Sequence, residues 1–417
     1  PPLSLTLRSG GLLGNLVKYS YMGDITSMKK FLSILCKIFI AFVVISIMGF
    51  LFVFHSPYTK LKDLWVTTAM TTYSHQYLAK WFVSEEEIAE IMKRNKVLDP
   101  KEEINLDLIN TQPQPLKTEK TEFIKTEETV TPIKEETFEE EPEETIEYEE
   151  EVDPIKLKQA IYSDKTPYYM DDKLEIYDIS GHNYKGKVMI IYDPSTVFLG
   201  VTKYLGEKGE WVMEMSKNYN AIAGINAGGF DDPNWMGSGG DPVGLTISEN
   251  QLIVKSGGKY HRIDMESDDI FKYYKRDEKF NLIGFNDENK LILGKYTMEK
   301  IKEMKIRDAV SFSPILILNG VPTEMTGNGG WGIAPRTGIG QRADGAVIFL
   351  TIDGRQPTWS IGAGVKDMRD IFIEFQAVNA VNLDGGTSTT MTLNHEMINK
   401  SCSKYGGRKI ATSWLVR

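Results

Sequence analysis

The 417-residue sequence predicts a mixed α/β fold, α+β-like, in which a mixed β-sheet with few helices is preceded by a transmembrane helix and a disordered acidic spacer. Three features carry this prediction. Glycine marks turns and close backbone approaches, and 31 of the 36 glycines lie after residue 155. A long apolar run lies near the N-terminus, and a strongly acidic segment lies between the two regions.

The apolar run Phe31–Phe54 carries a single charge, Lys37. Its uncharged part, from Ile38 onward, is at the short end of what spans a bilayer as a helix. Lys29 and Lys30 precede the run, so the positive-inside rule places the N-terminus in the cytoplasm and the rest of the chain outside. A cleaved signal peptide shares this charge pattern, but the run is long for one and no small-x-small site follows it.

These features predict a single-pass cell-membrane protein with an uncleaved signal-anchor at 28–55. Residues 1–27 form an N-terminal extension for which we predict no fold. The next segment, 56–100, is predicted to be a juxtamembrane helical segment, because Ser84 and Glu87 form a capping box before an apolar repeat. It could be a stalk or a pairing helix, but a solvated helix is the favoured interpretation.

The acidic linker is assigned to residues 101–154. Residues 101–153 hold 19 acidic side chains against 5 lysines, so the overall charge of −10 arises in this segment. Such a sequence buries too little apolar surface to offset its ordering entropy, and we expect an extended, disordered spacer.

Residues 155–417 form the predicted domain, in which short β-rich runs alternate with Gly and Asn/Asp turns. The expected strands are 187–193, 221–226, 243–247, 251–255, 314–319, 346–353 and 378–384. Val365–Ala377 carries an apolar stripe and is expected to be a helix. The turn Ala343-Asp344-Gly345 indicates antiparallel pairing around it.

Some classes of function find no support in the composition. Basic patches interleaved with aromatic residues are absent, so nucleic acid is not an expected partner. The two cysteines, Cys36 and Cys402, are far apart in the sequence, and no CxxC zinc motif occurs. The sequence predicts no cofactor.

The strongest chemical signal follows the last predicted strand. Asp384 closes this strand, so its carboxylate is expected at a sheet edge, where sites of α/β proteins lie. Gly385 and Gly386 allow a sharp turn that exposes backbone N–H groups, and Thr387 and Ser388 add hydroxyl donors. A loop with several convergent donors suits an anion such as phosphate.

Two arginines and an asparagine complete the pattern. Arg336 and Arg355 could make bidentate, permanently charged contacts with phosphate. Alternatively, Arg336 could pair with Asp353 or Asp344 across neighbouring strands. Asn226 ends another predicted strand, and it could merely cap a turn.

The motifs NAGGF (226–230), RTGIG (336–340), IDGR (352–355) and NLDGGTSTTM (382–391) resemble, in order and spacing, the phosphodiester glycosidase family. This is the family of the lysosomal uncovering enzyme and of bacterial exopolysaccharide-associated proteins. The resemblance covers roughly 190–417. The family usually shows N-G-G-F-F and D-G-G-G-S-S, so an alanine and a threonine replace glycines here.

The resemblance implies hydrolysis of a sugar-1-phosphodiester at the anomeric carbon, as in N-acetylglucosamine-1-phosphodiesters, in cell-wall or exopolysaccharide metabolism. It implies Asp384 as the reacting carboxylate, with Asp353 as second candidate, and Arg336 and Arg355 as a phosphate clamp. The other expected substrate-binding residues are Asn226, Gly229, Thr337, Gly385, Gly386, Thr387 and Ser388.

Two alternatives stay open. The same pocket could serve a non-catalytic binding or assembly module for a phosphate-bearing surface polysaccharide. A metal-dependent phosphodiesterase is the third possibility. The histidines of this sequence are unclustered and predict no metal ligands. Oxygen ligation of Ca²⁺ or Mg²⁺ by Asp231, Asp232 or Asp241 is chemically open.

Overall fold

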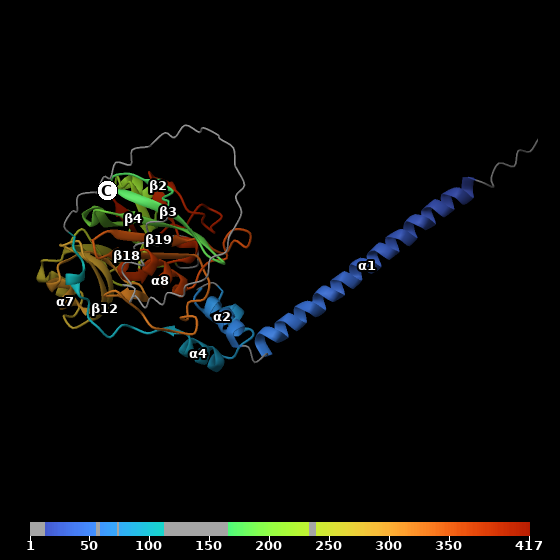
Figure 1. The fold of residues 1–417 in the computed structure, drawn as a ribbon, viewed down its shortest axis with the longest axis horizontal. Coiled ribbons are helices and arrows are strands. Elements are labelled where there is room, and N and C mark those ends of the chain that lie inside the picture. Colours follow the sequence, from blue (N-terminus) through green and yellow to red (C-terminus); the bar gives the residue numbers. More distant parts are fainter. Residues whose placement is uncertain (1–12, 56–58, 73–74, 112–165, 233–238) are drawn as a thin grey trace, which may run out of the picture.

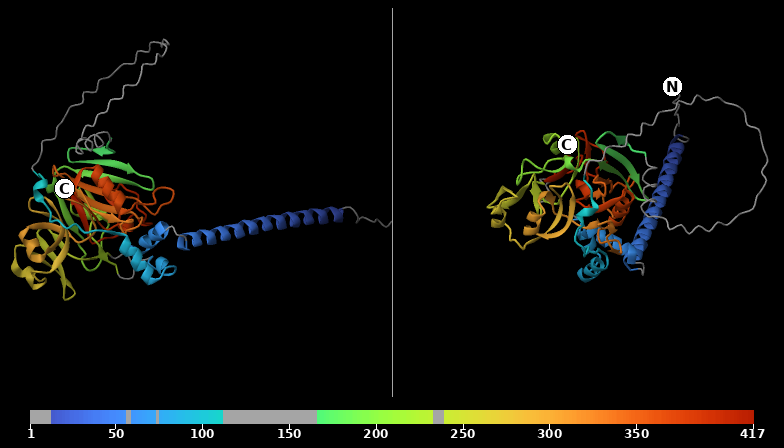
Figure 2. Two further views of the ribbon diagram at one scale, coloured as in Figure 1. Left: turned by 60° about the horizontal axis from the view of Figure 1, so that its bottom comes forward. Right: turned by 60° about the vertical axis from the view of Figure 1, so that its left-hand side comes forward.

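The computed structural model describes the chain except residues 1–12, 56–58, 73–74, 112–165 and 233–238. A domain of sheets lies at one end, and the long helix α1 (Leu13–His55) points away from it (Figure 1). The views in Figure 2 agree with this arrangement. The predicted α+β character is confirmed, and every strand pair in the described ranges is antiparallel.

The largest sheet has eight strands. Their order is β16 (Val321–Pro322), β15 (Ile315–Leu318), β20 (Ala377–Asn382), β18 (Arg336–Arg342), β19 (Val347–Ile352), β4 (Lys185–Ile191), β3 (Leu174–Ser180) and β2 (Tyr169–Met170).

Both faces of this sheet are covered, which explains why β19 is buried along its whole length and almost entirely apolar. Val347 and Phe349 point into the core shared with the other sheets. Ile348 and Leu350 point to the opposite face, where helix α8 (Val365–Glu374) packs. A strand alternates its side chains between the two faces, so only a sheet buried on both sides accepts such a run.

A five-stranded sheet faces the first across the core. Its order is β22 (Glu396–Met397), β21 (Met391–Leu393), β6 (Ala223–Asn226), β23 (Thr412–Val416) and β5 (Val197–Val201). Trp414 of β23 is fully buried in the shared core, with its ring edge-on to Phe285. Helix α6 (Val212–Asn218) packs on the outer face of this sheet through Met215.

A six-stranded sheet completes the domain. Its order is β11 (Lys259–Asp264), β10 (Gln251–Ser256), β9 (Thr246–Ser248), β14 (Ile306–Val310), β12 (Lys279–Asn286) and β13 (Leu291–Thr297). One of its faces contributes to the shared core, and the other packs against α7 (Met298–Glu303) and the 3₁₀ turn η4 (Asp268–Lys272). A two-stranded ribbon, β7 (Phe230–Asp231) with β8 (Asp241–Pro242), connects this sheet to the end of β6.

Six of the seven predicted strands coincide with observed ones, and the 243–247 run contributes only its end to β9. The predicted helix is α8, and the turn at 343–345 joins the antiparallel strands β18 and β19. The last predicted strand is shorter than expected. β20 ends at Asn382, so Asp384 lies in the following loop.

The segment between α1 and the domain is helical, as predicted, but it is not a solvated helix. It comprises α2 (Thr59–Met70), α3 (Tyr77–Lys80) and α4 (Glu85–Arg94), followed by β1 (Lys96–Val97), which pairs with β17 (Met325–Thr326) of the domain. Long-range contacts of this kind leave no local sequence pattern.

Polar bonds secure this docking. Thr71 Oγ1 donates to the Trp331 carbonyl (3.2 Å), and the Ile333 N–H donates to Thr68 Oγ1 (3.1 Å). Within the docked segment, Asp63 accepts hydrogen bonds from Arg94 Nε (2.9 Å) and Asn95 Nδ2 (2.8 Å).

Residues 101–111, which the sequence assigned to the acidic linker, also contact the domain. The Asn105 N–H donates to Asn319 Oδ1 (2.7 Å), and the Asn110 N–H donates to the Ala343 carbonyl (2.8 Å). The remaining linker, 112–154, lies outside the described residues. The chain therefore contacts the domain before residue 112. The contacts made by α2, Thr71 and β1 place the end of α1 close to the domain.

The docking predicts that a full-length chain cut once between residues 112 and 165 stays together as one particle in gel filtration under native conditions. Asp63→Ala should weaken the association by about 2 kcal/mol, because Asp63 orients Asn95, whose Oδ1 accepts from the Asn328 N–H of the domain. Asp99→Ala, which removes an exposed carboxylate from the same segment, is the matched control. Complete separation of the wild-type fragments would contradict the prediction.

Candidate functional site

Asp384 lies where the eight-stranded and five-stranded sheets meet. It follows β20, and its backbone is fixed from β6 of the other sheet. Its N–H donates to the Ala227 carbonyl (3.2 Å), and its carbonyl accepts from Asn226 Nδ2 (2.6 Å). The carboxylate is therefore held by two sheets rather than by its own strand.

The Asn226 side chain connects the end of β6 with β18 and with the segment after β20 through hydrogen bonds. It is 1% exposed, and its Oδ1 accepts hydrogen bonds from Thr337 Oγ1 (2.8 Å) and from the Thr390 N–H (3.1 Å). Thr337 is itself fully buried at the start of β18. Asn226 and Thr337 therefore lie beneath the site, where they orient the Asp384 loop.

The two glycines after Asp384 bring the loop close to the start of β18. The Gly386 N–H donates to the Pro335 carbonyl (2.9 Å), and a Cβ at Gly385 would lie 2.7 Å from that same oxygen. Gly386 has φ +64°, a left-handed conformation that favours glycine. Thr387 is half-buried and Ser388 buried in the 3₁₀ turn η5 (Gly386–Ser388) that follows.

Burial raises the pKa of Asp384 to about 6. The Ser388 hydroxyl, the Arg408 guanidinium, the Gly385 N–H and Arg355 all act in the opposite direction, because they stabilise the charged form. At neutral pH the carboxylate is mainly ionised, but it is poorly solvated. A carboxylate in this state suits a nucleophile or a general base.

Arg355 is the exposed cation of the site. It follows β19 with φ +58°, and its guanidinium lies over Gly386, where an added Cβ would be 3.3 Å from both terminal nitrogens. No salt bridge from Arg355 occurs within the described ranges. Burial raises the pKa of both Asp384 and the neighbouring Cys402 thiol, and the charge of Arg355 opposes this rise in each case. Arg355 is free to bind an anion beside the carboxylate.

Arg408 is a second cation that the sequence reasoning did not select. It forms a salt bridge with Asp232 and lies over the Phe230 ring, 4.8 Å from its centroid. It also stabilises the ionised form of Asp384. Its position within the 190–417 range of the family resemblance was the available signal.

Arg336 occupies a different environment. It is 4% exposed, and it donates to the backbone carbonyls of Ala363 (Nε, 3.1 Å), Trp331 (Nη2, 2.5 Å) and Gly332 (Nη2, 2.7 Å). Burial, together with Arg355 nearby, lowers its pKa to about 10. These bonds fix the 331–332 loop, and the pairing partner considered from sequence, Asp344, instead binds Arg342 (2.7 Å).

Asp353 is also engaged by the protein. Its Oδ2 accepts from Trp359 Nε1 (2.8 Å), and its Oδ1 accepts from Asn399 Nδ2 (3.2 Å) and the Lys400 N–H (3.0 Å). Burial raises its pKa, while these three hydrogen bonds oppose the shift. Asp353 therefore holds two surface loops beside the site.

Gly229 begins the β7–β8 ribbon. Its carbonyl accepts from the Val243 N–H (3.0 Å). Of the aspartates considered for a cation, Asp232 pairs with Arg408, and Asp241 accepts from Lys255 Nζ (2.5 Å) and Tyr260 Oη (2.8 Å). Positive or donor groups of the protein thus already neutralise both side chains.

An aromatic hollow of about 560 Å³ adjoins this ribbon on the six-stranded sheet. The hollow is lined by Pro242 of β8. Phe230, which contacts Arg408, lies on the paired strand β7. The rings that line it are Tyr260, Tyr273, Tyr274 and Phe280.

Comparisons with known proteins agree with this assignment of motifs. Residues 219–417 match the family model for phosphodiester glycosidases. The SPbeta prophage-derived protein YomE of Bacillus subtilis is 28% identical over 212 residues, which are 50% of this chain and 29% of that protein. The N-acetylglucosamine-1-phosphodiester alpha-N-acetylglucosaminidase of Bos taurus is 37% identical over 62 residues, 15% of this chain and 11% of that one.

The chain thus spans less than a third of the length of these curated relatives. Among solved structures, it is similar to the zebrafish enzyme of the same name as the bovine one, a catalytic domain auto-inhibited by its pro-peptide. The TM-score is 0.46 at 20% identity, over 61% of this chain and 86% of that one. A hypothetical protein from Synechocystis gives a TM-score of 0.40 at 15% identity, over 59% and 62%.

Substitutions of Arg336 and Arg355 should differ in their effect on stability. Arg336→Lys should lower the free energy of unfolding by about 2–4 kcal/mol, since lysine cannot reach three carbonyls with a planar fork. Arg355→Lys should change it by less than about 0.5 kcal/mol, because the side chain is exposed. Denaturant titration of both variants checks this, and equal stabilities would contradict it.

Proposed function

We propose that this chain, whose residues 219–417 belong to the phosphodiester glycosidase family, is a membrane-anchored extracytoplasmic hydrolase of sugar-1-phosphodiesters. The expected substrate class resembles the N-acetylglucosamine-1-phosphodiester in the bovine relative's name. The biological setting proposed is cell-wall or exopolysaccharide metabolism.

The observation that carries this proposal is the Asp384 carboxylate, which has a pKa of about 6 and lies near two guanidinium groups. Asp384 would act as nucleophile or base at the anomeric carbon. The bond between this carbon and the phosphate oxygen breaks, and the phosphomonoester leaves with the electron pair. Water supplies the hydroxyl group of the released sugar.

The surrounding residues fit the charge changes in this reaction. A phosphomonoester is a good leaving group, so a second carboxylate acting as general acid is less necessary than for ordinary glycosides. Arg355, and Arg408 beside it, would stabilise the phosphate as it departs. Thr387 and Ser388 would contact the sugar or phosphate. Asp353 is the second candidate for the carboxylate role, with its hydrogen-bonded loops as the argument against it.

Membrane attachment rests on α1. Its stretch Lys29–Phe54 is long and apolar enough to cross a bilayer, and none of its most apolar window is buried in the protein. The lysines on its N-terminal side support an orientation with the domain outside the cytoplasm.

A carbohydrate-binding or assembly module is the second proposal, and the aromatic hollow favours it. Aromatic rings stack on sugar rings, and the hollow's volume is in the range of ligand sites. Turnover of a chromogenic sugar-1-phosphodiester by the full-length chain in detergent separates the two functions. Saturable binding of phosphate-bearing polysaccharide without any turnover would favour the module.

Asp384→Asn should lower turnover by about a thousandfold or more, equivalent to about 4 kcal/mol of barrier, because the negative charge is lost while size is kept. Affinity for a sugar phosphate should be kept or improved, since repulsion of the phosphate is relieved. Asp353→Asn is the matched comparison. A normal rate for Asp384→Asn would transfer the role to Asp353.

The value of kcat/KM should rise with pH through about pH 6 and level off above it, because the reacting form is the ionised Asp384.

The free energy of unfolding should instead decrease as the pH rises. The folded pKa lies above the unfolded value, so ionisation is unfavourable in the native state and stability falls between about pH 4 and pH 6. Asp384→Asn should therefore be more stable than wild type at pH 8, with the difference shrinking at pH 4. Thermal unfolding at the two pH values measures this, and a pH-independent difference would argue against a raised pKa.

Arg355→Lys should weaken binding of inorganic phosphate and of sugar phosphate, since charge is kept but the bidentate fork is lost. The expected loss is about tenfold, equivalent to about 1.4 kcal/mol, by calorimetric titration. Unchanged phosphate affinity would remove Arg355 from the clamp.

A further inference from the structure

The end of α1 is built into the hydrophobic core of the docked helices. Phe54 is 8% exposed and packs in one cluster with Val66 of α2 and Ile91 of α4, both fully buried. The apolar helix thus contacts the packed segment directly, and that segment is bonded to the domain. Contacts of this kind fix where the base of α1 lies relative to α2–α4.

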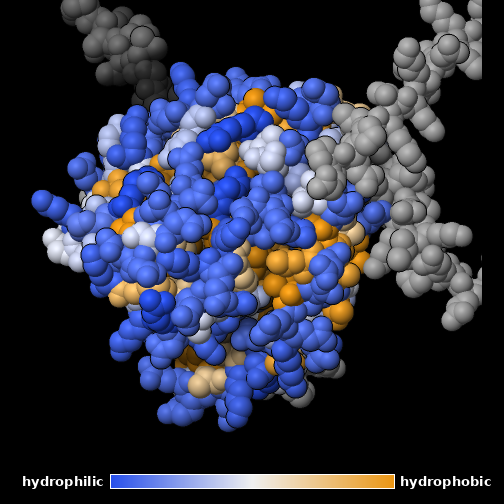
Figure 3. Space-filling view, turned by 90° about the vertical axis from the view of Figure 1, so that its left-hand side faces the viewer, coloured by the Kyte–Doolittle hydropathy of each residue, from blue (hydrophilic) through white to orange (hydrophobic). Residues whose placement is uncertain are grey.

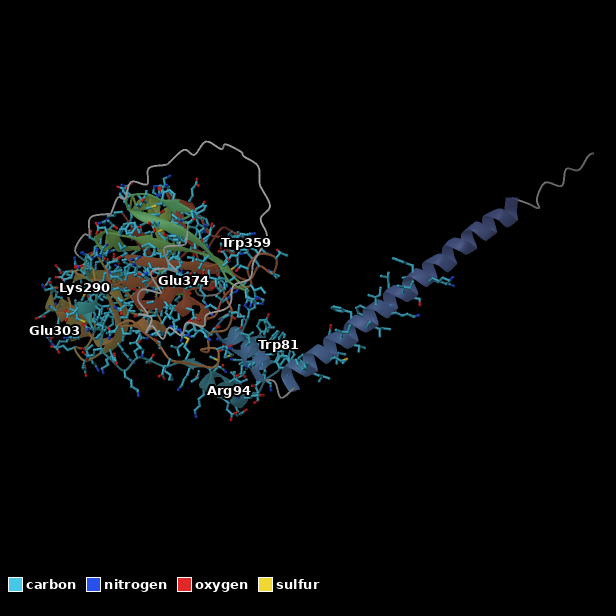
Figure 4. The ribbon with its side chains drawn as sticks, viewed as in Figure 1. Trp81, Arg94, Lys290, Glu303, Trp359 and Glu374 are labelled. Atoms are coloured by element: carbon cyan, nitrogen blue, oxygen red, sulfur yellow. The ribbon has the colours of Figure 1, made fainter. Side chains whose placement is uncertain are left out.

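Exposed aromatic rings surround the base of α1. They belong to Trp65 (40% exposed), Tyr77 (43%), Trp81 (70%) and Phe82 (45%), which we call the aromatic collar. Trp81 is labelled beside the base of α1 in Figure 4. Exposed side chains of this size are unusual in a group, because each leaves a large apolar area in water.

The collar is continuous with the apolar surface of α1. The Phe82 ring lies 5.1 Å from the ring of Phe50 and 5.5 Å from that of Phe54, and the Trp65 ring lies 5.8 Å from Phe54. Phe50 is four residues inside the apolar stretch, about 6 Å along the helix. A bilayer that surrounds α1 therefore reaches the collar at the depth of its headgroups and outer acyl chains.

We propose that the aromatic collar inserts into the interfacial layer of the bilayer that α1 spans. Tryptophan and tyrosine prefer this layer, because their rings are apolar and their polar groups can still find hydrogen bonds. Trp65 Nε1 already donates to the Leu78 carbonyl (3.1 Å). The exposed Lys60 and Lys80 lie on the same helices, where their ammonium groups can reach lipid phosphates.

The opposite end of the domain has a different surface. The face turned away from α1 is covered mostly by hydrophilic residues (Figure 3). This face therefore does not match an interfacial lipid environment, whereas the collar beside α1 does.

The collar also connects the bilayer with the site. Helix α2 carries Trp65 and Thr68, and Thr71 follows its last residue; the hydroxyl groups of Thr68 and Thr71 hold the 331–333 loop. That loop supplies two of the carbonyls that bind Arg336. Thr68 is nine residues from Thr59 along α2, about 14 Å of helix, so the 331–333 loop lies within about this distance of the start of α2. With the collar in the interfacial layer, substrates attached to the membrane surface would lie near this loop.

The test uses the full-length chain in liposomes of phosphatidylcholine with brominated acyl chains, which quench nearby tryptophan fluorescence. The inference rests on the proposed membrane anchoring, so flotation of the protein with the liposomes is measured first. Wild-type emission should be quenched, and Trp81→Phe should remove roughly half of the quenched emission, because Trp65 and Trp81 are the collar tryptophans.

Trp414→Phe is the control, because Trp414 is fully buried in the core shared by the sheets and no bilayer can reach it. It should leave the quenched emission unchanged. Failure to float would overturn the anchoring itself. Flotation with unquenched Trp81 would overturn the collar alone. Protection of Trp81 from aqueous acrylamide that depends on protein concentration in detergent would identify a second copy as the occupant, and would also overturn the proposal.

Discussion

The site depends on one buried side chain, Asn226, which joins two sheets. Its amide donates to the backbone of Asp384 and accepts from Thr337 and Thr390, so three chain segments meet on one polar group. A buried amide whose bonds are all made within the protein is rigid, because any movement would leave a polar group unpaired. Asp384 can thus keep its orientation although it lies in a glycine-rich loop. The catalytic proposal relies on this rigidity, since a nucleophile or base must be held near its reacting atom.

The electrostatics of the site follow from unequal burial of its cations. Arg336 is buried and donates its N–H groups to backbone carbonyls, whereas Arg355 is exposed and its guanidinium lies over Gly386. Arg408 is between these extremes, because Asp232 neutralises part of its charge. An incoming phosphate therefore meets one free guanidinium and one that is already paired. The same two charges limit how far burial can raise the pKa of Asp384, and they keep it ionised at neutral pH.

The docked N-terminal segment changes the relation between the anchor and the domain. A chain joined only through an acidic spacer would let the domain diffuse far from the bilayer. Instead, the hydrogen bonds of Thr68 and Thr71 with the 331–333 loop, and the short pairing of β1 with β17, hold the α2–α4 segment beside the site. With the proposed anchoring of α1, this architecture would favour substrates at the membrane surface over those deep in a surrounding polymer layer.

The sequence by itself determined the local features of this protein. The alternating and continuous apolar runs predicted strands such as β19, and the apolar stripe at Val365 predicted α8, because both patterns report which faces are buried. The loop after β20 was also predicted, since its glycines and hydroxyl residues are adjacent in the chain. The motifs predicted the resemblance to the phosphodiester glycosidase family, whose model matches residues 219–417, because their order and spacing are linear properties.

Only the tertiary structure decided what depends on distant residues. Two arginines of equal promise in sequence separated into a buried Arg336 and an exposed Arg355, and Arg408 joined them from the end of the chain. The expectation of an α/β sheet edge also changed, because the sheets are antiparallel and the site forms where two of them meet. Burial, and therefore the pKa of Asp384, is set by segments more than 150 residues apart. No local pattern encodes such contacts, because they exist only once the sheets have packed.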